Sequence, residues 1–269
     1  MKLLVFGDIY GRKGRQLIAQ YLPELRTKYD PDFVIANSEN LTNGKGPIPE
    51  HLHELQRSGV DIFTGGNHSF ANMDFCADYM NTPNSPQLRP ANFYDSKHYQ
   101  LPGRGVGLFE KNGKKLLVIN LISGNFLKDD VYNPFLKIDE ILTEHPLEKY
   151  DGIIVDFHRE STAESYCMAE WVSGRVSLQY GTHTHVQTND DRILASGTGA
   201  MTDIGMTGAL NSSIGQEFKG WIPTFVSGTG HFSGKKETDM GPGVVCGVFV
   251  EIQKGKCIHL EKIRIIEGV

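Results

Sequence analysis

Short polar clusters follow the apolar, strand-like runs of this chain, and they constrain its fold more than any other feature. The clusters are Gly7-Asp8, Asn37-Ser38-Glu39-Asn40, Gly66-Asn67-His68, Phe157-His158 and Gly181-Thr182-His183-Thr184-His185. Carboxylates, carboxamides and imidazoles are ligands of divalent metal ions. Loops at the carboxyl ends of neighbouring parallel strands bring distant residues together. The repeated placement therefore predicts one site built from strand ends.

The first part of the chain alternates strands with helices. The expected strands are Lys2–Gly7, Phe33–Ala36 and Asp61–Thr64, and the expected helices are Arg15–Lys28 and Glu50–Ser58. Gly11 and Gly14 are expected to break the chain before the first helix. Thr42–Pro49, which is rich in Gly and Pro, is expected to form a loop. This β-α-β-α-β order predicts a mostly parallel sheet.

The rest of the chain mixes helices with hairpins. We expect a loop over Asn81–Asn92, strands over Gly105–Glu110, Lys115–Leu121, Gly152–Phe157 and Val176–Tyr180, helices over Phe135–Glu144 and Thr162–Val172, and a final hairpin of Gly243–Ile252 and Lys256–Ile265. Asn112-Gly113 and Lys254-Gly255 are the expected hairpin turns. Together these elements predict an α/β fold of two packed mixed β-sheets, a β-sandwich, flanked by helices. No repeat or linker is visible, so residues 1–269 are expected to form a single domain.

Charge and composition exclude several functional classes. The net charge is −5 and no Lys/Arg-rich run occurs, which argues against binding long nucleic acid. No run approaches the roughly 20 apolar residues of a membrane span, and Met1–Asp8 is too short and too soon charged for a signal peptide. We therefore expect no membrane partner and a cytoplasmic protein. The cysteines form no CxxC pair and are expected to be reduced and mostly buried.

The ligand types in the clusters favour a pair of metal ions. A set of carboxylate, carboxamide and imidazole without thiolate fits Mn, Fe, Zn or Co better than a structural zinc site. For His183 and His185 alone, a solvated loop is the simpler interpretation, but the other clusters favour metal. Two divalent ions, two carboxylates and one hydroxide leave a charge of about +1, which attracts a phosphodiester anion.

The order and spelling of the clusters resemble the calcineurin-like metallophosphoesterases, and among them a branch of small bacterial phosphodiesterases, the YmdB-like proteins. The motifs that carry the resemblance are Phe6-Gly7-Asp8, Asn37–Asn40, Gly66-Asn67-His68, Asp156-Phe157-His158, Gly181–Thr188, Leu88–Asn92 and Thr202–Gly208. Tyr10 stands where the wider superfamily has a ligand histidine, and Glu39 replaces the usual bridging aspartate. Both departures are what the resemblance to the branch implies. The resemblance covers nearly the whole chain.

The resemblance also implies roles for individual residues. It assigns the first metal to Asp8, Glu39, Asn40 and His185, and the second metal to Glu39, Asn67, His158 and His183, with Glu39 as the bridge. His68 is implied to face the phosphate and to protonate the leaving alkoxide. Independently of the family, metal binding by Asn67 would place His68 beside the substrate, where a proton donor working near neutral pH is needed. The alternative for His68 is a helix-capping or core histidine.

We therefore expect a hydrolase, a dinuclear metal-dependent phosphodiesterase in which a metal-activated hydroxide attacks phosphorus. The resemblance implies small phosphodiesters as substrates, chiefly 2′,3′- or 3′,5′-cyclic nucleotides. The expected cofactors are two metal ions, iron, or else manganese or zinc. The alternatives are a phosphomonoesterase or protein phosphatase using the same site, and a non-enzymatic regulator. The oligomeric state stays open, with a homo-oligomer among the options.

Several residues keep two interpretations. Asp203 either supports a ligand histidine or forms a turn before Gly205, and Arg89 either binds phosphate or pairs with a carboxylate. His231 lies in Gly228–Gly234, which either covers the site or forms a surface loop. The histidines expected to lie outside the site are His51, His53, His98, His145 and His259.

Overall fold

The computed structural model describes residues 1–95, 100–127, 129–228 and 241–268. Its helices are α1 (Gly11–Tyr29), α2 (Pro49–Ser58), α3 (Met73–Met80), α4 (Pro134–Glu144), the 3₁₀ turn η1 (Leu147–Lys149), α5 (Thr162–Trp171) and α6 (Phe218–Ser227). Its strands are β1 (Lys2–Asp8), β2 (Phe33–Asn37), β3 (Ile62–Thr64), β4 (Val106–Lys111), β5 (Lys114–Ile122), β6 (Gly152–His158), β7 (Leu178–Thr182), β8 (Arg192–Ile193), β9 (Gly199–Met201), β10 (Gly208–Ala209), β11 (Gly243–Gln253) and β12 (Lys256–Ile266).

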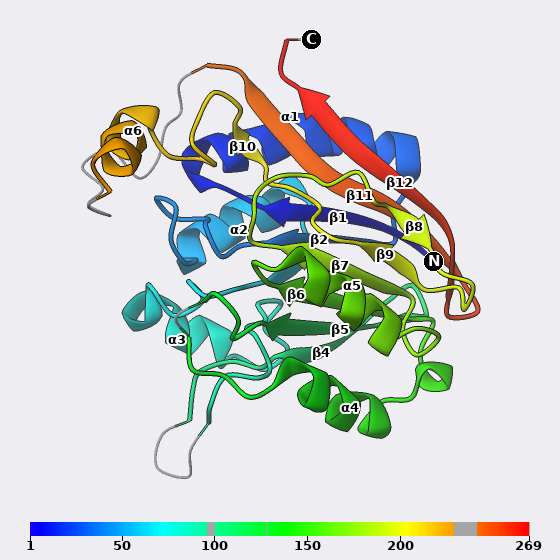
Figure 1. Ribbon diagram of the computed structural model, residues 1–269. Coiled ribbons are helices and arrows are strands. Elements are labelled where there is room, and N and C mark those ends of the chain that lie inside the picture. Colours follow the sequence, from blue (N-terminus) through cyan, green and yellow to red (C-terminus); the bar gives the residue numbers. More distant parts are fainter. Residues whose placement is uncertain (96–99, 128, 229–240, 269) are drawn as a thin grey trace.

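Two six-stranded sheets form the centre of the protein (Figure 1). The first has the order β10-β11-β1-β2-β3, with β12 paired to β11, and the second has the order β4-β5-β6-β7-β9-β8. The pairs β1–β2 and β2–β3 are parallel, as are β5–β6, β6–β7 and β7–β9, whereas β11 and β12 are antiparallel. The predicted fold of two packed mixed sheets is confirmed.

Three apolar layers hold the sheets and helices together. Between the sheets, Val5 and Ile35 of the first sheet pack in one cluster with Val118 and Ile154 of the second. The neighbouring residues of β1 face the other way and pack with α1 and α2. On the outer face of the second sheet, α4 and α5 cover β5 and β6. The strands that carry the site are therefore buried on both faces, which explains why they read as continuous apolar runs.

The first helix begins earlier than the sequence predicts. It starts at Gly11, so the expectation that Gly11 and Gly14 break the chain is wrong. A Cβ at Gly14 would lie 2.5 Å from the carbonyl oxygen of Thr207, so glycine lets the helix pack closely on a neighbouring segment.

Some elements were not visible in the sequence. Helix α6 is one of them, because it leaves most of its apolar side chains exposed and shows no clear helical stripe. The strand expected at Val176–Tyr180 is shifted to Leu178–Thr182. Both hairpin turns are confirmed, with φ of 53° at Asn112 and 51° at Lys254.

Two further expectations concern the cysteines and membranes. All four cysteines are free thiols, and all but Cys167 are buried. Within the described ranges, no helix has the length and apolar character needed to cross a bilayer.

Gly7 lets two backbone segments touch, and we expect its replacement to be destabilising. A Cβ at Gly7 would lie 1.7 Å from the carbonyl oxygen of Gly205. Because backbone cannot easily move aside, Gly7→Ala should lower the free energy of unfolding by about 3 kcal/mol, measured by urea denaturation. Gly124→Ala is the control, since its Cβ would meet only the side chain of Val131, at 3.3 Å. Equal stabilities of the two variants would contradict this explanation.

Candidate metal centre

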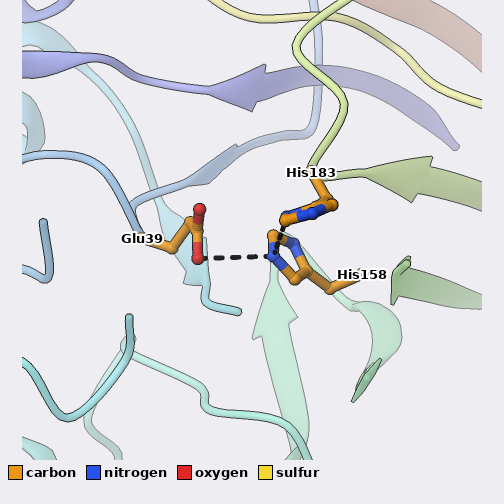
Figure 2. A group of neighbouring side chains, drawn as sticks. All are labelled: Glu39, His158 and His183. Atoms are coloured by element: carbon orange, nitrogen blue, oxygen red, sulfur yellow. Dashed lines mark hydrogen bonds and ion pairs between the residues drawn. The ribbon is translucent and has the colours of Figure 1, made fainter. Parts of the chain in front are cut away.

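The predicted site residues lie at the carboxyl ends of strands from both sheets. Asp8 ends β1, and the Glu39 and Asn67 segments follow β2 and β3 of the first sheet. His158 ends β6 of the second sheet, and His183 directly follows β7. Figure 2 shows the side chains of Glu39, His158 and His183 pointing toward one another. The sandwich therefore gathers residues that are far apart in the chain, as in the contact across 175 positions from the His183 backbone N–H to Asp8 Oδ2 at 3.3 Å.

Two groups of ligand-type side chains share one residue. The first consists of Asp8, Glu39 and His185, and the second of Glu39, His158 and His183. Within each group the ligand atoms all lie within 4.8 Å of one another. Glu39 belongs to both groups, which is the geometry expected of a residue between two cations.

Each of the three clustered imidazoles directs an unprotonated nitrogen into the site. His185 Nδ1 lies 2.8 Å from the carbonyl oxygen of Ile214, which can only accept, so Nε2 carries the lone pair. Thr182 donates its hydroxyl to Asp156 at 2.7 Å and accepts from His158 Nδ1 at 2.9 Å, which leaves Nε2 of that ring unprotonated. These contacts fix the tautomers in the form that binds metal.

The third imidazole follows the same rule through a residue that the sequence did not single out. His183 Nε2 lies 3.1 Å from the Glu160 carboxylate and therefore carries the proton. Its Nδ1 lies 3.1 Å from His158 Nε2, so the two lone pairs face each other. Such an arrangement is repulsive unless a cation lies between the nitrogens, which supports a metal at this position. Glu160 could have been found by its position two residues after His158.

The carboxylates of the site are also arranged for a cation. Asp8 is fully buried, and its Oδ1 has no hydrogen-bond partner among the described residues. That oxygen lies 3.7 Å from His185 Nε2. Glu39 is 1% exposed, and its Oε2 lies 3.3 Å from His158 Nε2. A buried carboxylate oxygen without a donor is costly, and a divalent cation would satisfy it.

The space beside Gly66 is filled by side chains of the site and would not accommodate a Cβ. A Cβ at Gly66 would lie 2.4 Å from the ring of His158 and 2.6 Å from Glu39 Oε2. Glycine at this position therefore allows Glu39 and His158 to approach each other across the two sheets.

The pKa values follow from burial and from these contacts. Burial, with the charge of Glu39 second, raises the pKa of Asp8 well above its ordinary value. Burial alone would raise the pKa of Glu39, but the surrounding histidines lower it below its usual range. Burial lowers the pKa of His158 to about 3 and also lowers that of His185. These imidazoles are therefore neutral near pH 7, as metal ligands must be.

The two carboxamides differ in how they face the site. Asn67 directs Oδ1 toward His158 Nε2 at 2.9 Å, where it could also bind a metal. Asn40 instead directs Nδ2 toward Glu39 Oε1 at 2.6 Å and His185 Nε2 at 3.0 Å. Metal binding through Asn40 would therefore need its amide group to turn by half a rotation.

His68 lies at the accessible side of the cluster. Its side chain is 35% exposed, and its Nδ1 lies 3.5 Å from Glu39 Oε1. Burial would lower the pKa of His68, but the Glu39 carboxylate outweighs burial and raises it. His68 is thus neither a core histidine nor a helix cap, because it lies before α3 beside the shared carboxylate.

Asp156 is a buried hydrogen-bond acceptor for residues next to the ligand groups, a role that the sequence did not predict. It is fully buried and accepts hydrogen bonds from Thr64 at 2.5 Å, Thr182 at 2.7 Å and Asn37 at 3.2 Å. Burial raises the pKa of Asp156 to about 7, although these donors oppose the shift. Asn37 therefore belongs to this support and not to the ligand groups.

The structure shows the contacts of Asp203 and Arg89, two of the residues that had two interpretations. Asp203 accepts from the Gly205 backbone N–H, as the turn interpretation predicts, and also from Thr184, which lies between His183 and His185. Arg89 pairs with Asp95 at 2.8 Å, as the carboxylate interpretation predicts.

The remaining histidines lie elsewhere. His51 contacts Thr42, His145 contacts Tyr150, and His259 lies near Glu261. His53 is exposed on α2. His98 and His231 lie outside the described residues.

Comparisons with known proteins agree with this geometry. A profile of the YmdB-like protein family matches residues 4–263. A Bacillus subtilis protein named 2′,3′-cyclic-nucleotide 2′-phosphodiesterase is 38% identical over 267 residues, which cover 98% of this chain and 97% of that protein. The crystal structure of a phosphatase from Mycoplasma pneumoniae has 35% identity and a TM-score of 0.89, and the match covers 99% of this chain and 94% of that one. A crystal structure of a hypothetical protein from Thermus thermophilus gives 30% identity and a TM-score of 0.89, with 99% and 100% covered. The expected family is confirmed, and the chain belongs to the YmdB-like proteins among the metallophosphoesterases.

Proposed function

We propose that this protein is a dinuclear metal-dependent phosphodiesterase that hydrolyses small cyclic phosphodiesters. The observation that carries the proposal is the pair of ligand groups joined by Glu39. The relative from Bacillus subtilis, which is named a 2′,3′-cyclic-nucleotide phosphodiesterase, supports 2′,3′-cyclic nucleotides as the first substrates to test.

The donor set fits two divalent ions. One would be held by Asp8, Glu39, Asn40 and His185, and the other by Glu39, Asn67, His158 and His183. Nitrogen and oxygen ligands without thiolate suit iron, manganese or zinc. Two such ions would lower the pKa of an attacking water and offset the charge of the phosphodiester.

The residues of the chain supply the remaining steps. The unprotonated imidazoles and the buried carboxylates would hold the cations, and the cations would supply the positive charge that binds the phosphate. Asn67 places the next residue, His68, at the open side of the cluster. The Glu39 carboxylate raises the pKa of His68, which favours the protonated imidazole that would donate a proton to the leaving alkoxide.

Metal analysis and a substrate panel test the proposal together. The purified protein should contain close to two transition-metal ions per chain. It should cleave bis-p-nitrophenyl phosphate and 2′,3′-cyclic AMP at least about tenfold faster than p-nitrophenyl phosphate, because a site of low net positive charge favours a monoanionic diester. Chelation should remove the activity, and added Mn²⁺ should restore it. A clear preference for the monoester would favour a phosphomonoesterase, and metal-loaded protein without hydrolysis would favour a regulator.

A further inference from the structure

Two ligand histidines lie on a backbone segment with an unusual conformation. His183 has a φ of 104° and His185 a φ of 65°, both in the left-handed region. Side chains with a Cβ adopt this region only where the surroundings hold them there. Thr184 lies between these histidines, so contacts to Thr184 can stabilise the backbone conformation of both.

Asp203 stabilises the Thr184 backbone by hydrogen bonds. Its Oδ2 accepts the backbone N–H of Thr184 at 3.0 Å and the Thr184 hydroxyl at 2.8 Å. Its Oδ1 accepts the Gly205 backbone N–H at 2.8 Å. Each carboxylate oxygen therefore accepts a hydrogen bond from a backbone N–H. Asp203 is entirely buried, so water does not compete for these bonds.

Arg159 is the counterion of Asp203. Its side chain is fully buried, and Nη1 lies 3.5 Å from Asp203 Oδ2. Its Nε and Nη2 have no hydrogen-bond partner within the described part of the chain. The guanidinium packs on Gly181, where an added Cβ would lie 2.4 Å from Nη2. A guanidinium keeps its charge when buried, so Arg159, directly after β6, and Asp203, just after β9, form an ion pair.

We propose that Asp203, paired with Arg159, is a positioning residue that sets the Thr184 backbone so that His183 and His185 reach the two metals together. The inference rests on the proposed dinuclear site, but it makes a separate statement about metal affinity. A merely structural role would change the stability of the protein and leave metal affinity unaltered.

The first test is Asp203→Asn. An asparagine has one acceptor oxygen and one donor NH₂, so either Thr184 or Gly205 would face a donor where it needs an acceptor. We expect Mn²⁺ affinity to fall about 10–100-fold, as is typical when a residue that orients ligands is lost. The measurement is isothermal titration of metal-free protein with Mn²⁺, accompanied by thermal unfolding of the metal-free state.

Matched variants separate positioning from stability. Thr184→Ser keeps both bonds to Asp203 and should retain the parent affinity, whereas Thr184→Val loses the hydroxyl bond and should bind Mn²⁺ more weakly. Asp190→Asn is the control, because Asp190 accepts from the Thr202 hydroxyl at 2.5 Å and from its backbone N–H at 3.2 Å but contacts no site histidine. Its Mn²⁺ affinity should equal that of the parent.

The outcomes distinguish the two proposals. A parent protein that binds no Mn²⁺ would overturn the proposed function. A parent that binds Mn²⁺, with Asp203→Asn binding equally well at a lower melting temperature, would overturn the positioning role alone. Should Asp203→Asn fail to fold, the comparison of Thr184→Val with Thr184→Ser decides the question.

Discussion

Glu39→Gln is expected to abolish phosphodiester hydrolysis by removing the metals. Glu39 is the residue common to both ligand groups, so its neutral analogue weakens both metal sites at once. Bound metals contribute several kcal/mol of charge stabilisation, and a loss of about 4 kcal/mol lowers kcat/KM by about 10³-fold. The measurements are the metal content of the purified variant and its rate on 2′,3′-cyclic AMP.

A matched glutamate separates this effect from a general loss of charge. Glu54 accepts from Arg15 at 2.7 Å on the helical side of the first sheet and belongs to neither ligand group. Glu54→Gln should therefore keep its metals and its activity. If Glu39→Gln purified with two metals and normal turnover, Glu39 could not be the bridge.

His68→Ala is expected to lower turnover while both metals stay bound. General acid catalysis typically contributes about 10²–10⁴-fold, so kcat on 2′,3′-cyclic AMP should fall within that range. The loss should be much smaller on bis-p-nitrophenyl phosphate, because p-nitrophenolate leaves readily without a proton. The comparison of the two substrates at unchanged metal content is the decisive measurement.

The control for His68 is a histidine outside the site. His145→Ala removes only the contact with Tyr150 at 2.6 Å and should leave both rates unchanged. An equal loss on the two substrates would instead assign His68 to metal or phosphate binding. Parent-like turnover of the cyclic nucleotide by His68→Ala would exclude it as the proton donor.

The clustering of these side chains could be predicted from the sequence because the signals for it are local. Each ligand cluster directly follows an apolar run, and buried strands such as β1 and β6 have strongly apolar sequences. The carboxyl ends of parallel strands then meet without further information. The ligand grouping followed from the family resemblance, and the structure brings four of the expected side chains, Asp8, His158, His183 and His185, together around Glu39.

The supporting residues could not be predicted in the same way. Glu160, Asp156 and Arg159 act through contacts between segments that only the packed sheets bring together. Helix α6 was missed for a related reason, since most of its apolar side chains are exposed and it has no apolar stripe that faces the core. The prediction for Gly11 and Gly14 was wrong because glycine occurs both at chain breaks and where a helix packs closely on a neighbouring segment.

The placement of the ligands on both layers of the sandwich bears on how such a protein would mature. The first sheet supplies Asp8 and Glu39, the second supplies His158 and the histidines after β7, and neither sheet alone supplies either of the two ligand groups. A nascent chain would therefore acquire its cations only after the layers had docked. Loading would mark the end of assembly, and partly folded chains would have little capacity to sequester scarce metals.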